Sequence, residues 1–163
     1  MVFFFKKPVQ WEEMADGGFQ ANAFIAGSQE TRKQIFVARV KHEDGLQPCQ
    51  LKEGHGGAQM PYGGEGKTLS NYEVLAASGG LFWKSIAVGE LPVEALKTGN
   101  EANGDALYSA KYKTEGKLYI GKYNGKDKAY FVIDHKEREI ESGDIRILCY
   151  QECAPREEVS MEI

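Results

Sequence analysis

The sequence has no long apolar run, no excess of basic residues and no paired-cysteine motif. No stretch is long enough to span a bilayer, so stable membrane insertion is not expected. Lysine and arginine number 20 against 24 acidic residues, which gives a net charge of −4. Because nucleic-acid binding relies on a basic surface, this balance argues against nucleic acid as a partner. The three cysteines, Cys49, Cys149 and Cys153, lack a CxxC spacing and predict reduced thiols in a cytosolic protein, with a Cys149–Cys153 bridge as the alternative.

A signal for export is also missing. The N-terminal segment MVFFFKKP has only four apolar residues after Met1, and its basic pair follows them, so it is not expected to be a signal peptide. We therefore expect a cytoplasmic protein, with release by a leaderless route as the alternative.

Motifs for catalysis are equally scarce. No serine lies in a GxSxG elbow, and Pro61 stands where the segment Gly64–Thr68 would need a glycine to form a phosphate-binding loop. The histidines have no short metal-ligand spacing between them: His42, His55 and His135. We therefore expect no enzymatic activity, no cofactor and no metal site.

Glycine, in contrast, is abundant. Its 19 residues punctuate the chain every few positions, which favours many short strands and tight turns and predicts an all-β protein. In the first half we expect strands at Lys33–Val40 and Asn71–Ala77, a hairpin turn at Asp44-Gly45, and a glycine-rich connection from Gly54 to Gly66. In the second half we expect a turn at Glu115-Gly116 and strands at Asp105–Tyr112, Lys117–Tyr123, Ala129–Ile133 and Gly143–Tyr150.

One structural unit occurs twice in the chain. Trp11, Gly17, Ala23 and Gly27 recur as Trp83, Gly89, Ala95 and Gly99, at a constant offset of 72 residues (83 − 11). A register of this kind indicates two copies of one module, and each copy would be marginally stable alone, so we expect both to share one core. The predicted organisation is an N-terminal extension (1–10), a first motif (11–77), a joint (78–82), a second motif (83–150) and an acidic disordered tail (151–163).

This pattern resembles a tandem pair of DM-nine motifs. The resemblance is carried by the W-x5-G-x5-A-x3-G spacing, the ARV and AKY strand ends with their DG and EG turns, and the YGGEG…NYEVL segment of the first copy. It implies an all-β body in which two copies pack with internal pseudo-two-fold symmetry. It also implies a mannose-binding lectin that recognises microbial glycans in innate immunity, and a homodimer, as in some members of the family.

The resemblance also assigns site residues. In the lectin members the sugar is held by an acid two residues after the glycine of an AG pair and by a lysine in a Pro-Gly-Lys corner. By position these roles fall to Glu101 and Lys122 in the second copy, although Glu replaces Asp and Ile120 replaces the proline. In the first copy they fall to Gln29 and Gln50, which lack both charges and would bind more weakly.

The charged pair suits a sugar on chemical grounds. A hexose presents neighbouring hydroxyls, and a carboxylate and an ammonium can bind adjacent ones through charge-assisted hydrogen bonds. Gly99 and Gly121 are expected to let the backbone approach the sugar closely. Two alternatives stay open. Glu101 and Lys122 form an ordinary surface ion pair, or the protein is an intracellular interaction module that has kept the fold and lost sugar binding.

Overall fold

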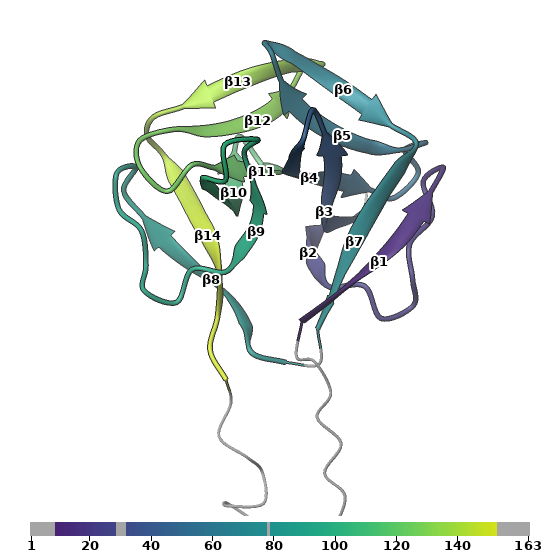
Figure 1. Cartoon of the computed structure of the whole chain (residues 1–163), viewed down its shortest axis with the longest axis horizontal. Coiled ribbons are helices and arrows are strands. Elements are labelled where there is room, and N and C mark those ends of the chain that lie inside the picture. The colour runs from purple at the N-terminus through teal and green to yellow at the C-terminus, as the bar shows by residue number, and fades with distance from the viewer. Residues whose placement is uncertain (1–8, 29–31, 78, 153–163) are drawn as a thin grey trace, which may run out of the picture.

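The computed structural model describes residues 9–28, 32–77 and 79–152, and the regular structure in them is β-strand (Figure 1). The strands of the first copy are β1 (Val9–Ala15), β2 (Ile25–Ser28), β3 (Gln34–His42), β4 (Gly45–Lys52), β5 (Ala58–Tyr62), β6 (Glu65–Leu69) and β7 (Asn71–Ala77). Those of the second copy are β8 (Leu81–Ile86), β9 (Lys97–Asn100), β10 (Ala106–Thr114), β11 (Lys117–Tyr123), β12 (Ala129–Ile133), β13 (Lys136–Ile140) and β14 (Asp144–Tyr150). The prediction of an all-β protein is confirmed. A helix able to cross a membrane is absent from the described ranges.

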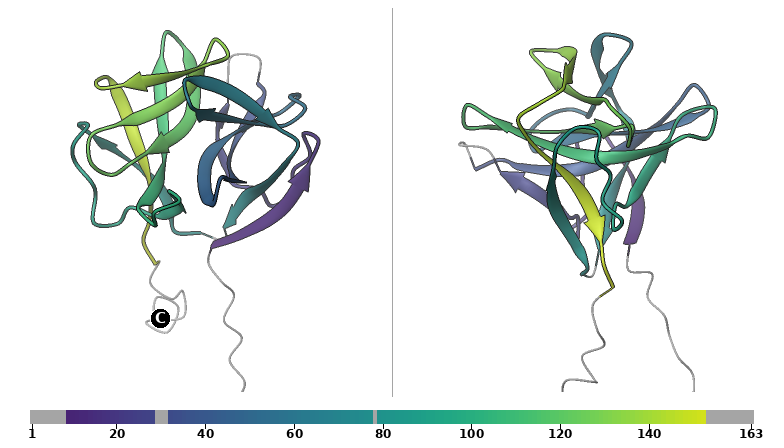
Figure 2. Two further views of the ribbon diagram at one scale, coloured as in Figure 1. Left: turned by 45° about the horizontal axis from the view of Figure 1, so that its top comes forward. Right: turned by 90° about the vertical axis from the view of Figure 1, so that its left-hand side faces the viewer.

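The strand order shows an internal two-fold relation between the copies. The main path runs β1-β7-β3-β4-β5-β6-β13-β12-β11-β10-β14-β8, and replacing each strand by its counterpart in the other copy gives the same path reversed. The copies meet where β6 pairs with β13 and where β9 pairs with β4. Figure 1 shows the two halves side by side with the β5–β6 and β12–β13 hairpins at the same end, and the views in Figure 2 agree. Tandem packing with pseudo-two-fold symmetry is therefore confirmed.

Apolar clusters fill each copy and the space between the copies. Side chains alternate along a strand, so β3 contributes to two clusters. Phe36 and Ala38 face the cluster of the first copy, whereas Ile35 and Val37 face the cluster that both copies share. Burial on both faces explains why the sequence of β3 is a nearly continuous apolar run. The second copy adds Leu118, Ile120 and Leu148 to the shared cluster.

The first hairpin turn lies one residue earlier than predicted. His42 pairs with Gly45, so the central turn residues are Glu43 and Asp44, with φ angles of 46° and 64°. Gly45 belongs to β4, where an added Cβ would lie 3.0 Å from the carbonyl oxygen of Asn100 in the other copy. This glycine therefore allows close packing between the copies, and the Asp44-Gly45 turn prediction is wrong by one position.

In the second copy the predicted turn is correct. Thr114 pairs with Lys117, which leaves Glu115 and Gly116 as the central residues, with φ angles of 49° and 75°. These two positions follow Glu43 and Asp44 at the same offset of 72 residues (115 − 43), so the structural repeat is kept through both hairpins.

The glycine-rich passage from Gly54 to Gly66 is not a simple connection. It contains β5 and the start of β6, joined by a turn at Gly63-Gly64 with φ angles of 62° and 84°. A Cβ at Gly66 would collide with Val132 of the other copy. Glycine here permits close contact between strands. Composition alone does not distinguish this role from that of glycine in a loop.

Several sequence predictions concern residues outside the described ranges. They are the N-terminal residues 1–8, Gln29, and the acidic tail from Cys153 onward. Of the other cysteines, Cys49 and Cys149 are buried free thiols. Burial raises the pKa of both thiols, which keeps them protonated.

Candidate functional site

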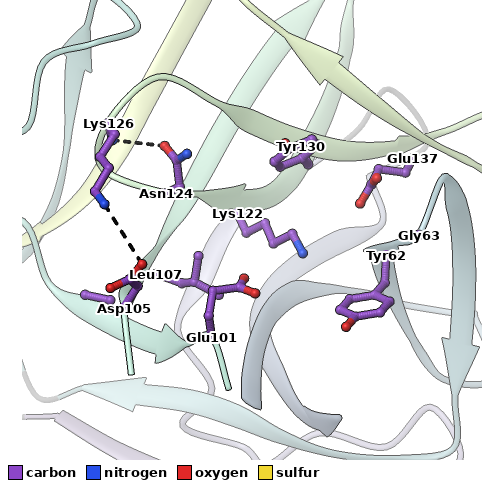
Figure 3. Close-up of a pocket in the computed structure, with 11 residues that line it drawn as sticks. Tyr62, Gly63, Glu101, Asp105, Leu107, Lys122, Asn124, Lys126, Tyr130 and Glu137 are labelled. Carbon is purple, nitrogen blue, oxygen red and sulfur yellow. Dashed lines mark hydrogen bonds and ion pairs between the residues drawn. The ribbon is translucent and has the colours of Figure 1, made fainter. Parts of the chain in front are cut away.

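A pocket of about 500 Å³ lies where the second copy meets the β5–β6 hairpin of the first (Figure 3). We call it the second-copy pocket. Its lining includes both residues that the resemblance assigned there, Glu101 and Lys122. The other lining residues are Tyr62, Gly63, Asp105, Ala106, Leu107, Asn124, Lys126, Tyr130 and Glu137. The structure thus brings the predicted carboxylate and ammonium to one cavity, and the first copy supplies part of its wall.

Glu101 is positioned by a hydrogen-bonded turn that follows β9. Its backbone N–H donates to the carbonyl oxygen of Asp105 at 2.8 Å, and its own carbonyl accepts from Gly104 N–H and Asn100 Nδ2, both at 2.9 Å. Because Asn100 pairs with Leu46, the turn is also tied to the first copy. With the backbone held in this way, the carboxylate faces the pocket (Figure 3).

Lys122 is buried, with only 6% of its surface exposed. Its Nζ lies 5.1 Å from the centre of the Tyr62 ring and 5.6 Å from that of Tyr130, distances at which a cation is attracted to an aromatic face. Burial lowers the pKa of the ammonium, and the nearby carboxylates of Glu101 and Glu137 oppose that shift. Figure 3 shows the ammonium reaching toward the space between Glu101 and Tyr62.

A glutamine of the first copy links the two predicted residues. Lys122 Nζ donates to Gln47 Oε1 at 2.7 Å, and Gln47 Nε2 donates to Glu101 Oε1 over a longer 3.4 Å. Gln47 is 1% exposed, and no ion pair within 4.0 Å joins Glu101 and Lys122 in the described part of the chain. The alternative of an ordinary surface ion pair is therefore wrong, because the lysine is buried and an amide separates the two charges.

Four residues at the site were not predicted from the sequence: Gln47, Tyr62, Tyr130 and Glu137. For Tyr130 a signal was available, since it lies directly opposite Lys122 in the β11–β12 ladder. Both strands were predicted, so pairing them would have placed this ring beside the lysine. Gln47 and Tyr62 come from the other copy, and no local pattern connects them to the site.

The glycines beside the site have a different role from the one expected. A Cβ at Gly99 would collide with the carbonyl oxygen of Leu46 and with the Pro48 ring, and a Cβ at Gly121 would collide with the carbonyl oxygen of Tyr130. Both glycines therefore serve close packing between strands. The expectation that they open the backbone to a sugar is wrong.

The corresponding cavity of the first copy is smaller, about 220 Å³, and we call it the first-copy pocket. It is lined by Gln50, Lys52, His55, Gln59, Lys117, Tyr119, Val132, Asp134 and His135. Gln50 is 5% exposed, and its amide already has protein partners. Its Oε1 accepts from Ile120 N–H at 2.9 Å, and its Nε2 donates to Gln59 Oε1 at 2.8 Å. Gln29, its predicted companion, lies outside the described residues.

Comparison with known proteins agrees with the repeat seen in the structure. The family model of the DM9 (DM-nine) repeat matches residues 2–69 and 30–142, two overlapping segments that together span most of the chain. The crystal structure of the nematode sperm cell motility protein MFP2B is similar in fold, with a TM-score of 0.66 and 17% sequence identity. The similarity covers 90% of this chain and 45% of that one, so this chain spans less than half of that protein. A search of curated proteins finds no match. From the two family matches and the repeated fold, we conclude that this chain belongs to the DM9 repeat family.

Proposed function

We infer that the protein binds carbohydrate, and that it holds a mannose-type hexose in the second-copy pocket without transforming it. The observation that supports this inference is the convergence of a carboxylate and a buried ammonium on one cavity. Glu101 lies in the turn after β9 and Lys122 lies in β11, and their side chains face the same 500 Å³ space. Such a pocket is large enough for a monosaccharide.

The hydrogen-bonding capacity of the pocket matches neighbouring hydroxyls. The Lys122 ammonium carries three N–H groups, and the structure gives one of them to Gln47. The others are available to sugar oxygens. The Glu101 carboxylate accepts one long bond from Gln47 and keeps further acceptor positions for sugar O–H groups. One hydroxyl can therefore accept from the lysine while its neighbour donates to the glutamate.

Tyr62 and Tyr130 add two aromatic rings to the proposed binding site. Their rings lie on either side of the ammonium and line the cavity. An aromatic face presents a flat apolar surface with negative potential, against which the C–H groups of a pyranose can pack. The two rings also shield the lysine from water, which strengthens its hydrogen bonds to a ligand.

The affinity of one such site should be low. Hydrogen bonds to charged groups contribute about 1.5–3 kcal/mol each before the cost of binding, which gives dissociation constants near the millimolar range. Useful binding to a glycan surface would then need several sites presented together. A homodimer, as the family resemblance implies, would supply them.

Isothermal titration with mannose tests the proposal. We expect saturable binding to the wild type and about tenfold weaker binding to Glu101→Gln, which removes the charge and keeps the shape. The matched control is Glu141→Gln, because Glu141 is exposed and lines neither pocket. Equal affinities in Glu101→Gln and the control would refute the site. Absence of saturable heat with mannose and other hexoses would refute the lectin function itself.

A second candidate function is that of a protein-interaction module without a sugar ligand. It is favoured by exposed apolar side chains on the equivalent β1–β2 and β8–β9 connections and at the first residue of β2. They are Phe19, Ile25, Leu91 and Val93, of which Val93 is fully exposed. A glycan array separates the two candidates, since a module of this kind would give no hits.

A further inference from the structure

We propose that the first-copy pocket is an anion site that takes the phosphate or sulfate group of a small ligand. This proposal concerns the cavity lined by Gln50, Gln59, Lys52, Lys117, His55 and His135. It goes beyond the proposed sugar binding in the second-copy pocket, and neither proposal depends on the other.

Both copies build the walls of this cavity. Lys52 and Gln59 belong to strands of the first copy, and Lys117 begins β11 of the second. The turn at Asp134-His135, with φ angles of 54° and 63°, adds an imidazole from the β12–β13 hairpin. Gly66 N–H donates to the carbonyl oxygen of His135 at 3.1 Å, which fixes this turn against the first copy.

The titratable groups of the cavity are mainly basic. Two lysines and two histidines line it, against one carboxylate, that of Asp134. In the described ranges neither Lys52 nor Lys117 has a carboxylate within ion-pair distance. Burial lowers the pKa of Lys52, and the charges of Lys33 and Lys117 lower it further. Burial likewise lowers the pKa of His55, with Lys52, Lys33 and His135 adding to the effect. The local field is therefore positive and only partly neutralised.

A relay of hydrogen bonds fixes the orientation of the Gln50 and Gln59 side-chain amides. The N–H of Ile120 can only donate, so the oxygen of Gln50 must face it. The nitrogen of Gln50 then faces Gln59, whose oxygen accepts the bond. This arrangement leaves the Nε2 group of Gln59 without a partner among the described residues and able to donate into the cavity. The relay begins at a backbone donor and ends at a side-chain donor.

An excess of donors over acceptors in the cavity favours an oxyanion over a neutral sugar. Two ammonium groups and the amide of Gln59 can each give a hydrogen bond to a tetrahedral anion, and bonds of this charge-assisted kind are short and strong. A cavity of about 220 Å³ accommodates one phosphate or sulfate group. The anion could be free or attached to a sugar, and the two sources share the same recognition chemistry.

The decisive variant is Gln59→Glu. Glutamate keeps the oxygen that accepts from Gln50 and replaces the donor nitrogen by a negatively charged acceptor, with almost no change in shape. A second variant, Lys52→Gln with Lys117→Gln, removes two charges from the pocket. Its control is Lys97→Gln with Lys113→Gln, which removes two exposed charges that line neither pocket.

The measurement is a two-dimensional amide NMR titration of the full chain with inorganic phosphate, with mannose 6-phosphate and with mannose. We expect both phosphates to shift amides around the first-copy pocket, with about tenfold weaker binding in Gln59→Glu and in the pocket double variant. The control double variant should bind like the wild type. The spectra themselves report whether each variant is folded.

Each outcome decides the proposal. Equal affinities for the two phosphates would identify a free anion as the ligand, and tighter binding of the sugar phosphate would identify a phosphorylated sugar. Both results support the site. The proposal is overturned if neither phosphate shifts these amides up to tens of millimolar, if the shifts centre elsewhere, or if the pocket double variant binds as its control does. A protein that binds both phosphates at this pocket but does not bind mannose would refute sugar binding in the second-copy pocket and would still support the anion site.

Discussion

The two pockets occupy equivalent places in the repeated unit and carry opposite chemistry. In the second copy Lys122 donates to Gln47, which donates to Glu101, so the relay ends at a negatively charged acceptor. In the first copy the equivalent strand position is Gln50, and its relay ends at the donor nitrogen of Gln59. A cavity with a donor and an acceptor suits neutral hydroxyls, and a cavity in which donors outnumber acceptors suits an anion.

In the proposed sites, the residues that would select the ligand differ from those that hold the fold. Apolar side chains on alternating strand positions hold both copies in the same conformation. Lys122 and Gln50 stand at one position of the repeat, and each is satisfied by a partner from the other copy. A single exchange at this position, together with the partner it selects, changes the hydrogen-bonding groups that line the cavity while the strands stay in place.

The largest effect should come from breaking the contact that supports one pocket. Gly99→Ala places a Cβ against the Leu46 carbonyl and the Pro48 ring, which are rigid, and should lower the free energy of unfolding by about 3 kcal/mol. The equivalent change, Gly27→Ala, meets the end of the Leu118 side chain, which can adjust, and should cost about 1 kcal/mol. Urea unfolding of both variants measures the difference. Equal costs would show that the two contacts between the copies are alike.

Removing the buried ammonium should weaken sugar binding in the second-copy pocket and leave anion binding in the first-copy pocket unchanged. Lys122→Met keeps the length of the side chain and removes its charge, and we expect mannose binding to weaken by more than about tenfold. Binding of phosphate at the other pocket provides an internal comparison on the same sample. Titration calorimetry with mannose gives the affinity. A Lys122→Met protein that binds mannose as the wild type does would contradict the assignment.

A pH series should separate two consequences of the buried lysine. Burial sets the pKa of Lys122 below its ordinary 10.5, so the folded state loses this proton at a lower pH than the unfolded state. Between the two pKa values the unfolded state holds more protons, and the contribution of Lys122 to stability therefore rises with pH. Sugar affinity should fall severalfold over the same range, because the donor charge is lost.

Tyrosine ionisation should not obscure that result. The pKa values of Tyr62 and Tyr130 are raised, mainly by the Glu43 hydrogen bond in the first and by burial in the second. These shifts move the ionisation of both rings to higher pH, whereas burial moves that of Lys122 to lower pH. Calorimetric affinity and urea unfolding, both measured from pH 7 upward on wild type and Lys122→Met, test the prediction, since the variant should lack both trends attributed to this residue.

The smallest effect is expected at the rim of the second-copy pocket. Lys126 lies 3.9 Å from Asp105, and the two side chains are 74% and 60% exposed. Because exposed ion pairs contribute little, Lys126→Ala should change stability by less than about 0.5 kcal/mol and mannose affinity by less than about twofold. A large loss of affinity would mean that the rim, rather than the buried lysine, contacts the sugar.

Much of the fold was predictable because its signals are local. Apolar and aromatic patterns identified β3, β7, β10, β11, β12 and β14, and the Asp44-Gly45 and Glu115-Gly116 signals located the hairpins of both copies to within one position. The strands β5 and β6 escaped because their glycines resemble those of a loop. Position 66 must be glycine because a Cβ there would collide with Val132 of the other copy. No residue close to Gly66 in the sequence indicates this requirement.

The candidate site was predictable only in part. The repeat and the family resemblance pointed to Glu101 and Lys122, and the structure places both on one pocket. Pairing β11 with β12 would also have found Tyr130. Gln47 could not be found, because 75 residues separate it from Lys122 and it shares no motif with it.

By itself the sequence determined several β-strands of each copy, the duplication of the unit and the positions of the charged residues, since each of these depends on neighbours along the chain. The tertiary structure decided which residues face each other across the two copies. A side chain becomes a donor or an acceptor toward a ligand only after its protein partners are fixed. For Lys122 and Gln50 those partners come from the opposite copy, and the docking of the two halves selects them.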